Sequence, residues 1–185
     1  MNKIILKMEK NIEDNYDLEL VNGDNEPHKK VSKELRIISD LLTDICEEGT
    51  GLKDNNTSII KPFISKKIPN VSIRNYLERL SKYSKIENNT LLLVLIYIDR
   101  ICELNKIRLN YFNIHKLILG GLLIAIKYNE DDYFSNIFYS KVGGVSKKEI
   151  DNLEYEFLTL IDFNLYVSDD LFIRYYDYIK NVDEE

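Results

Sequence analysis

Two stretches of the chain are apolar on every helical face, and they form the centre of the predicted fold. Residues 117–126 read LILGGLLIAI and residues 91–98 read LLLVLIYI, without a charged side chain in either. A helix that is apolar all round belongs inside a bundle, covered by other helices. Gly120 and Gly121 each cost about 1 kcal/mol of helix propensity, so we expect another helix to cross close to the backbone there. Lys127 ends the central apolar run.

The other apolar residues recur at the spacing of amphipathic helices, which we expect to surround this pair. One stripe runs from Leu35 to Ile45, and another follows the capping box formed by Ser146 and Glu149. The predicted helices begin at or just after Ser32, Ser72, Asn89, Asn113, Ser146 and Ser168. The remaining pattern offers a loop over residues 49–62 and a turn at residues 143–144. No segment alternates in the manner of a strand, so the pattern predicts an all-α domain.

The composition indicates one domain in a reducing compartment. The chain has 185 residues, enough for one well-buried domain. Cys46 and Cys102 stand far apart without a CxxC motif, so we expect neither a disulfide framework nor a metal site. The apolar runs are well short of the roughly 20 residues that cross a bilayer, and the N-terminus does not have the pattern of a signal peptide. We therefore expect an intracellular protein, cytoplasmic or nuclear, that binds no membrane and no cofactor.

The formal net charge of −6 is distributed unevenly along the chain. Between Lys61 and Lys85 the only acidic residue is Glu78. The basic residues of this stretch, called the basic segment below, are Lys61, Lys66, Lys67, Arg74, Arg79, Lys82 and Lys85. A charge run of this kind is most often a solvated face, and the alternative is a docking surface for an acidic or phosphorylated partner. The negative net charge argues against a general nucleic-acid binder.

One acidic residue interrupts the apolar stripe of the helix that follows Ser146. Glu154 lies four residues after Ile150 and four before Leu158, within or beside the stripe. A carboxylate in that position needs hydrogen bonds or an opposite charge, because burying it alone is costly. Considered alone it is a bordering surface residue. Considered with Lys127, it forms a candidate pair of opposite charges that presents donors and an acceptor to a partner.

Several motifs between Val31 and Lys180 together resemble one family. They are PNVSIRNYLERLSKYS from Pro69, LIYIDRI from Leu95, NIHKLILGGLLIAIKY from Asn113, DDYFSNIFYSKVGGV from Asp131 and LEYEFLTLIDFNLYVS from Leu153. Their order and spacing resemble the single-box cyclins of the P and U types, which are related to the yeast phosphate-pathway cyclins. The resemblance implies a cyclin box, a bundle of five helices around a central buried one, with an extra helix at each end. It divides the chain into a polar extension (1–30), an N-terminal helix and loop (31–62), the box (63–167) and a C-terminal helix and tail (168–185).

The resemblance also assigns roles to individual residues. In cyclins, the lysine that ends the central helix and a glutamate in the fifth helix contact the regulatory helix of a cyclin-dependent protein kinase, and Lys127 and Glu154 match them. The neighbouring apolar contacts implied for the kinase are Ile124, Tyr128, Leu158, Phe163 and Leu165. Arg79 and Asp99 match an internal arginine–aspartate ion pair of the box. The implied function is a cyclin subunit that activates a kinase by positioning its regulatory helix.

Two features depart from the family pattern. Lys116 stands where relatives usually have arginine, which keeps the charge but loses the planar fork. The MRAIL sequence that begins the substrate-docking patch of cell-cycle cyclins is replaced by residues 78–81, ERLS. We therefore do not expect substrates to be recruited by that route.

Two other functions have to be weighed against a kinase activator. Asp99, Cys102 and His115 could be read as a nucleophilic set, but no spacing brings His115 to Cys102, and we expect His115 to be a packed or capping residue. We therefore expect no enzymatic activity from the chain itself. The alternative is a cyclin-fold adaptor that activates no kinase.

Overall fold

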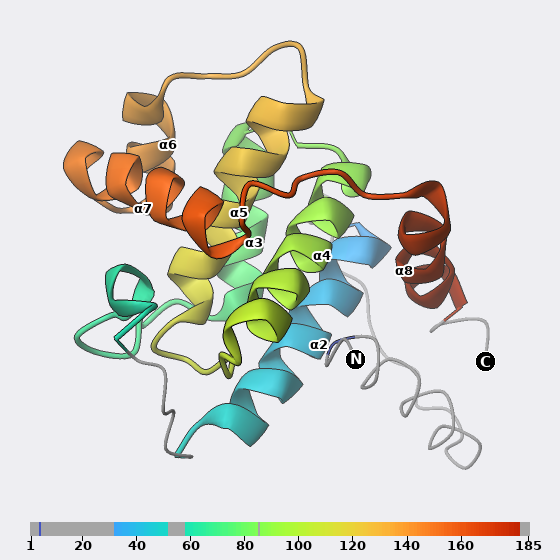
Figure 1. Cartoon of the computed structure of the whole chain (residues 1–185), viewed down its shortest axis with the longest axis horizontal. Helices are drawn as coiled ribbons and strands as arrows, with labels where there is room; N and C mark the ends of the chain where they lie inside the picture. The colour runs from blue at the N-terminus through green and yellow to red at the C-terminus, as the bar shows by residue number, and fades with distance from the viewer. Residues whose placement is uncertain (1–3, 5–31, 52–57, 85, 182–185) are drawn as a thin grey trace, which may run out of the picture.

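The computed structural model describes Ile4 and residues 32–51, 58–84 and 86–181, and within these ranges it contains helices and no strand (Figure 1). This confirms the predicted all-α class. The helices are α2 (Lys33–Gly49), the 3₁₀ helix η2 (Lys61–Phe63), α3 (Ile73–Ser84), α4 (Asn88–Asn105), α5 (Ile114–Asn129), α6 (Asn136–Gly143), α7 (Lys147–Leu160) and α8 (Asp169–Asn181). Most of the predicted extension, residues 1–30, and Lys85 lie outside the described residues. Within those ranges no helix combines the length and apolarity needed to cross a membrane.

Serine side chains mark where four of the helices begin. The hydroxyl of Ser32 accepts from the backbone N–H of Leu35 at 3.2 Å, and that of Ser146 accepts from Glu149 at 3.1 Å. Ser72 and Ser168 make the equivalent bond to the residue three positions on. Each bond satisfies one of the N–H groups that the first helical turn leaves without a partner.

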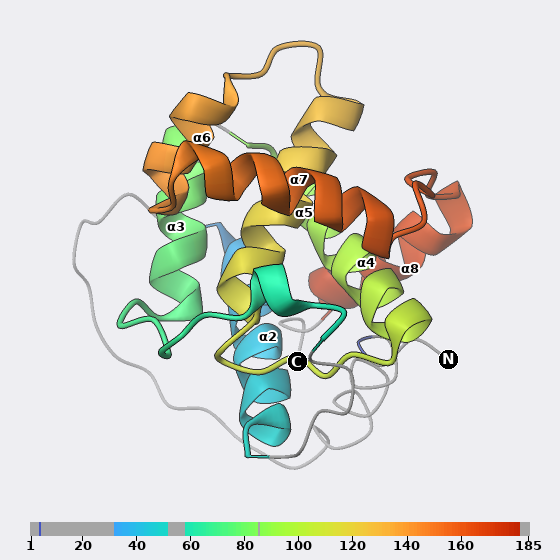
Figure 2. The ribbon, with the colours of Figure 1, turned by 60° about the vertical axis from the view of Figure 1, so that its left-hand side comes forward.

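The central helix of the box is α5, as predicted. Every residue from 117 to 126 is buried, and Figures 1 and 2 show α5 among α3, α4 and α7, with α7 crossing in front of it in the second view. A Cβ atom added at Gly120 would lie 2.9 Å from the Phe157 ring, and one at Gly121 would lie 3.1 Å from it. The glycine pair therefore admits the Phe157 side chain of α7, which confirms the expected close crossing.

The segment between α5 and α7 contains a helix that the pattern did not predict. Only a turn was expected at residues 143–144, but Asn136–Gly143 form α6, and Gly144 follows it with a φ of 72°. A Cβ atom at Gly143 would lie 2.5 Å from Leu119, so the last turn of α6 packs directly on α5. With α6 included, the box has the five helices α3 to α7.

The structure does not contain the predicted ion pair between Arg79 and Asp99. Asp99 is fully buried on the side of α4 that packs against α8, and its carboxylate accepts from the N–H of Ile4 at 3.2 Å and from the hydroxyl of Tyr175 at 2.5 Å. Arg79 instead lies on the side of α3 near α6, with its guanidinium 5.0 Å from the centre of the Tyr76 ring. The two residues face different neighbours, so Asp99 connects the box to the C-terminal helix.

His115 fixes the segment before α3 to the start of α5. Its Nε2–H donates to the carbonyl oxygen of Val71 at 2.8 Å, and its ring packs edge-on against Tyr76 at 5.0 Å. Only 6% of its surface is exposed, which confirms it as a packed residue. Burial lowers the pKa of His115, the bond to Val71 opposes this, and the charge of Arg79 lowers the pKa further.

Replacing Tyr175 by phenylalanine should lower the free energy of unfolding by about 1–3 kcal/mol, because a buried carboxylate loses a hydrogen-bond donor. Chemical denaturation measures this change. The matched control is Tyr176→Phe, the next residue along α8, which is partly exposed and should alter stability by less than about 0.5 kcal/mol. Equal stability of the two variants would contradict a role for Tyr175 in satisfying Asp99.

The lowered pKa of His115 should make the fold less stable in mild acid. The unfolded chain takes up the imidazole proton near its usual pKa of 6.5, whereas the folded chain does so only at lower pH. The stabilisation is therefore complete above about pH 6.5 and is lost as pH falls through the folded pKa. Denaturation series across this range should show a shallower pH dependence for His115→Gln than for the unchanged chain. The same slope in both proteins would contradict the assignment.

Candidate functional site

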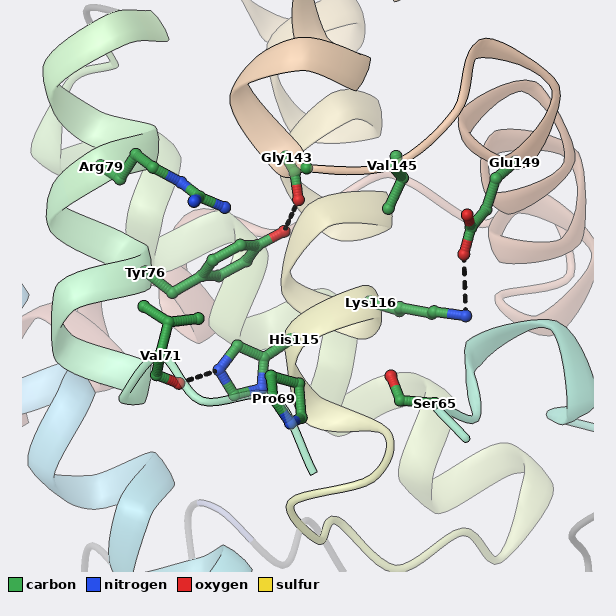
Figure 3. A pocket seen from close by; sticks show the side chains of 11 residues that line it. Ser65, Pro69, Val71, Tyr76, Arg79, His115, Lys116, Gly143, Val145 and Glu149 are labelled. Carbon is green, nitrogen blue, oxygen red and sulfur yellow. Dashed lines mark hydrogen bonds and ion pairs between the residues drawn. The ribbon is translucent and has the colours of Figure 1, made fainter. Parts of the chain in front are cut away.

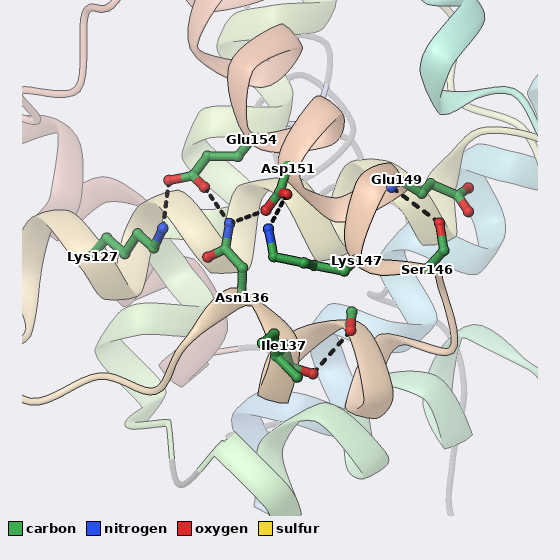
Figure 4. Close-up of polar contacts among 9 residues, drawn as sticks. Lys127, Asn136, Ile137, Ser146, Lys147, Glu149, Asp151 and Glu154 are labelled. Carbon is green, nitrogen blue, oxygen red and sulfur yellow. Dashed lines mark hydrogen bonds and ion pairs between the residues drawn. The ribbon is translucent and has the colours of Figure 1, made fainter.

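An ion pair at the end of α5 links the two residues that the sequence singled out. The ammonium of Lys127 lies 2.6 Å from one carboxylate oxygen of Glu154 on α7 (Figure 4). The other carboxylate oxygen of Glu154 accepts from the side-chain amide of Asn136, at the start of α6, at 2.7 Å. The structure thus brings Lys127 and Glu154 together and joins three helices at one point.

The polar network continues along α7. The amide of Asn136 also donates to Asp151 at 2.9 Å, and the ammonium of Lys147 lies 2.5 Å from the second oxygen of Asp151. The hydrogen bond from Lys147, followed by that from Asn136, holds the pKa of the Asp151 carboxyl below its usual range. Side chains tied together in this way are held in one arrangement before any partner arrives.

Lys127 and Glu154 remain accessible although they are bonded to each other. The side chain of Lys127 is 26% exposed and that of Glu154 is 22% exposed. Both groups lie at the border of the apolar core, where water is partly excluded and charge interactions are stronger than in bulk solvent. A partner with backbone donors and acceptors can therefore reach both groups at the same edge.

Apolar side chains lie exposed on the segments next to this pair. Tyr128, which follows Lys127, is 54% exposed, and Phe163 after α7 is 64% exposed. Leu158 and Leu165 are partly buried and pack against the core. Ile124 is only 3% exposed, so the structure corrects its predicted place among the surface contacts. It lies one turn before Lys127 and Tyr128 and packs in the core beneath that end of α5.

The chain after α7 is held in a strained turn that presents Phe163. Asp162 and Phe163 have φ values of 54° and 53°, in the left-handed region that bulky residues rarely adopt. The turn is tied to α4, since the hydroxyl of Tyr97 donates to the carbonyl of Leu165 at 2.9 Å and Arg100 donates to the carbonyls of Asn164 and Tyr166. Local strain that the surroundings maintain is often found where a protein binds a partner.

Further exposed apolar residues on α6, on α7 and on the segments that flank these helices were missed in the sequence. They are Tyr133 and Phe134 in the connection from α5 to α6, Ile137 on α6, Tyr155 beside Glu154 on α7, and Tyr166 beyond the strained turn. Helical spacing gives no clear signal for most of them, because they lie in connections or in the short helix that the pattern did not predict. Tyr155 lies on the predicted helix α7, but it is 65% exposed and is not part of the apolar stripe of that helix. Large apolar side chains that are exposed on neighbouring segments are candidates for contact with another protein.

The structure assembles no catalytic set from Asp99, Cys102 and His115. The ring nitrogen of His115 that makes a hydrogen bond does so with the backbone of Val71, and it does not contact Asp99. Burial raises the pKa of the other cysteine, Cys46, to about 12, so this thiol is a weak nucleophile. Over the described ranges, no cluster of three or more histidine, cysteine or acidic side chains could hold a metal ion.

The basic segment is only partly free to meet a partner. Lys61, Lys66, Lys67 and Lys82 are exposed. Arg74 is paired with Asp40 of α2 at 2.6 Å, and it therefore joins two helices. Arg79 is half-buried against Tyr76.

Comparison with known proteins identifies the family. The cyclin family model matches residues 18–165. The chain is 38% identical to cyclin-U2-1 of Arabidopsis thaliana over 61% of this chain and 51% of that protein. It is 31% identical to cyclin-U4-1 of the same plant over 81% of this chain and 76% of the relative, and 35% identical to PHO85 cyclin-7 of Saccharomyces cerevisiae over 72% and 52%. The chain thus spans about half the length of two of these three relatives. With an all-helical box built around α5 and a cyclin model that matches most of its length, the chain belongs to the cyclin family, and it is similar to the U-type and PHO85 cyclins within it.

Proposed function

We propose that the chain is the regulatory subunit of a cyclin-dependent protein kinase and that it binds the kinase through Lys127, Glu154 and the exposed apolar residues around them. The observation that carries this proposal is the accessible Lys127–Glu154 pair at the border of the core. The ammonium of Lys127 can donate to a backbone carbonyl of the kinase, and the carboxylate of Glu154 can accept from a backbone N–H group. Tyr128, Phe163 and Leu165 supply apolar contact beside it.

The proposed mechanism is allosteric, with no chemistry done by this chain. A protein kinase is active when the lysine–glutamate ion pair that aligns ATP is in place, which depends on the position of its regulatory helix. A partner that binds only the active position shifts the kinase population toward it, within the limit set by its differential affinity. A surface already held by hydrogen bonds suits this role, because less conformational freedom is lost on binding.

The four exposed lysines of the basic segment, together with Lys85, are proposed to attract acidic or phosphorylated substrates to the complex. The four exposed lysines lie on η2, α3 and the segment between them, whereas the proposed kinase-binding residues lie on α5, α7 and the turn after α7. Electrostatic attraction by these lysines would raise the local concentration of substrate, and the lysines themselves would take no part in phosphoryl transfer.

Charge reversal at Lys127 or Glu154 should abolish the kinase complex. Lys127→Glu and Glu154→Lys each replace a matching charge with a repelling one, so co-purification and kinase activation should fall at least about tenfold, while circular dichroism keeps the helical signal. Lys82→Glu, an exposed charge reversal on α3, is the control and should bind normally. The kinase for this assay is the one recovered with the tagged chain by affinity purification and mass spectrometry.

The double variant Lys127→Glu with Glu154→Lys distinguishes a direct contact with the kinase from a purely structural role of the ion pair. The swap restores the internal ion pair, so stability should return to that of the unchanged chain, but each charge would face the wrong kinase group and binding should stay lost. Restored binding in the swap, or normal binding in both single variants, would overturn the proposed interface. If the unchanged chain binds the kinase but does not activate it, the adaptor function would be supported instead.

Neutralising the lysines of the basic segment should weaken substrate capture only. Changing Lys61, Lys66, Lys67, Lys82 and Lys85 to glutamine should raise the KM for acidic peptide substrates by about tenfold or less, since each exposed charge contributes little. The KM for an uncharged peptide and the affinity for the kinase should not change, and these serve as controls. An unaltered KM for acidic peptides would leave the segment as a solvated face.

A further inference from the structure

Tyr97 and Arg100 of α4 bind three consecutive backbone carbonyls in the chain that follows α7. The hydroxyl of Tyr97 donates to the carbonyl oxygen of Leu165 at 2.9 Å. The guanidinium of Arg100 donates to the carbonyl of Asn164 with one nitrogen and to that of Tyr166, at 3.0 Å, with the other. Bonds from a charged donor are stronger than those between neutral groups, and the planar guanidinium fixes the spacing of the two carbonyls that it bridges.

The three carbonyls directly follow the strained turn at Asp162 and Phe163. Both residues have φ values in the left-handed region, which a residue as bulky as phenylalanine rarely adopts. The N–H of Phe163 donates to the carbonyl of Leu158 at 2.9 Å, so α7 holds the turn on one side and Arg100 holds it on the other. A strained conformation persists only where its surroundings maintain it. These bonds therefore determine how the exposed ring of Phe163 is presented to solvent.

Tyr97 also lies next to the end of α5. Burial raises the pKa of the Tyr97 hydroxyl, a hydrogen bond with Asn129 lowers this pKa, and the neighbouring Tyr128 raises it. Tyr128 and Asn129 are the two residues that follow Lys127 on α5. The turn after α7 and the end of α5 therefore meet at Tyr97, so α4 joins the two parts of the proposed kinase-binding surface.

A comparable tie, far from this surface, is made by Lys116 at the start of α5. Its ammonium donates to the carbonyls of Pro62 and Ile64 at 3.4 and 3.5 Å, and it lies 2.8 Å from the carboxylate of Glu149 (Figure 3). Lys116 lies about three helical turns, or roughly 16 Å along α5, from Lys127. It is therefore a matched control for Arg100, because it also holds a loop by two backbone carbonyls.

We propose that Arg100 is a positioning residue of the kinase contact, which holds residues 163–166 so that the Phe163 ring meets the kinase beside Tyr128. Arg100 acts through the turn. A ring that is held in place before binding loses less conformational freedom when the partner arrives. The inference rests on the proposed function, and it adds the residue of α4 on which the apolar part of the contact depends.

A double-mutant cycle on kinase affinity tests this proposal, with the full chain and the kinase that is recovered with it. Arg100→Met should weaken kinase binding at least about fivefold, and Phe163→Ala should weaken it at least about tenfold. In the Phe163→Ala chain, Arg100→Met should cost less than about twofold, because the contact that it positions is already lost. Arg100→Lys should lose nearly as much as Arg100→Met, since an ammonium lacks the fork that bridges two carbonyls.

Two further measurements distinguish positioning from a purely structural role. Lys116→Met should lower the midpoint of unfolding but leave the kinase affinity unchanged. In the free chain, the amide of Phe163 should exchange faster in Arg100→Met than in Lys116→Met, because the turn is no longer held by α4.

The outcomes separate this inference from the proposed function. If Arg100→Met lowers stability without lowering affinity, or lowers affinity equally with and without the Phe163 ring, the inference is overturned. If Phe163→Ala weakens binding and Arg100→Met does not, the kinase contact stands and only the inference fails. If Phe163→Ala binds the kinase as the unchanged chain does, the contact at this turn fails as well. Should Arg100→Met not fold, the same cycle with Arg100→Lys decides the question.

Discussion

The contact between the Phe157 ring and the backbone of Gly120 and Gly121 is the constraint on which the rest of this structure depends. A side chain at either glycine would occupy the space of that ring, so the two glycines allow α7 to approach α5 closely. Phe63 of η2 packs edge-on against the same ring, with 6.2 Å between ring centres. The contact therefore also holds η2, which carries Lys61 of the basic segment, against α5 and α7. Overpacking at such a contact typically costs about 1–3 kcal/mol.

The position of α7 on α5 in turn creates the proposed partner-binding surface. Glu154 precedes Phe157 by one turn of α7, and Lys127 follows the glycine pair by about two turns of α5, so the crossing brings the two charges within 2.6 Å. At the far end of α7, the strained turn at Asp162 and Phe163 is held by α4 and presents an aromatic ring to solvent. Both halves of the surface thus depend on elements that are already packed, which suits a partner that stabilises one conformation of another protein.

Sequence patterns predicted the core well because the core is repetitive in its chemistry. The uninterrupted apolar run predicts a buried central helix, the serine caps predict where helices begin, and the glycine pair predicts a close helix crossing. The structure contains all three features. Helix α6 was not predicted because it has only eight residues and no clear apolar stripe. The Arg79–Asp99 pair was wrong because a family pattern gives residue types without the direction in which each side chain points. Tyr175, the observed partner of Asp99, lies 76 residues away in the chain, and no local signal connects the two. The buried position of Ile124 was likewise set by packing.

The measurement that tests the account most directly is amide hydrogen exchange of the chain with and without its kinase. If the kinase binds at the end of α5 and at the turn after α7, exchange should slow in residues 127–134 and 161–166. Residues 65–71 and 143–149, which contact the start of α5 through Val71 and Glu149, should exchange as in the free chain. Protection confined to α2 and α8, with none at residues 127–134, would contradict the claim that Lys127 and Glu154 form the kinase contact.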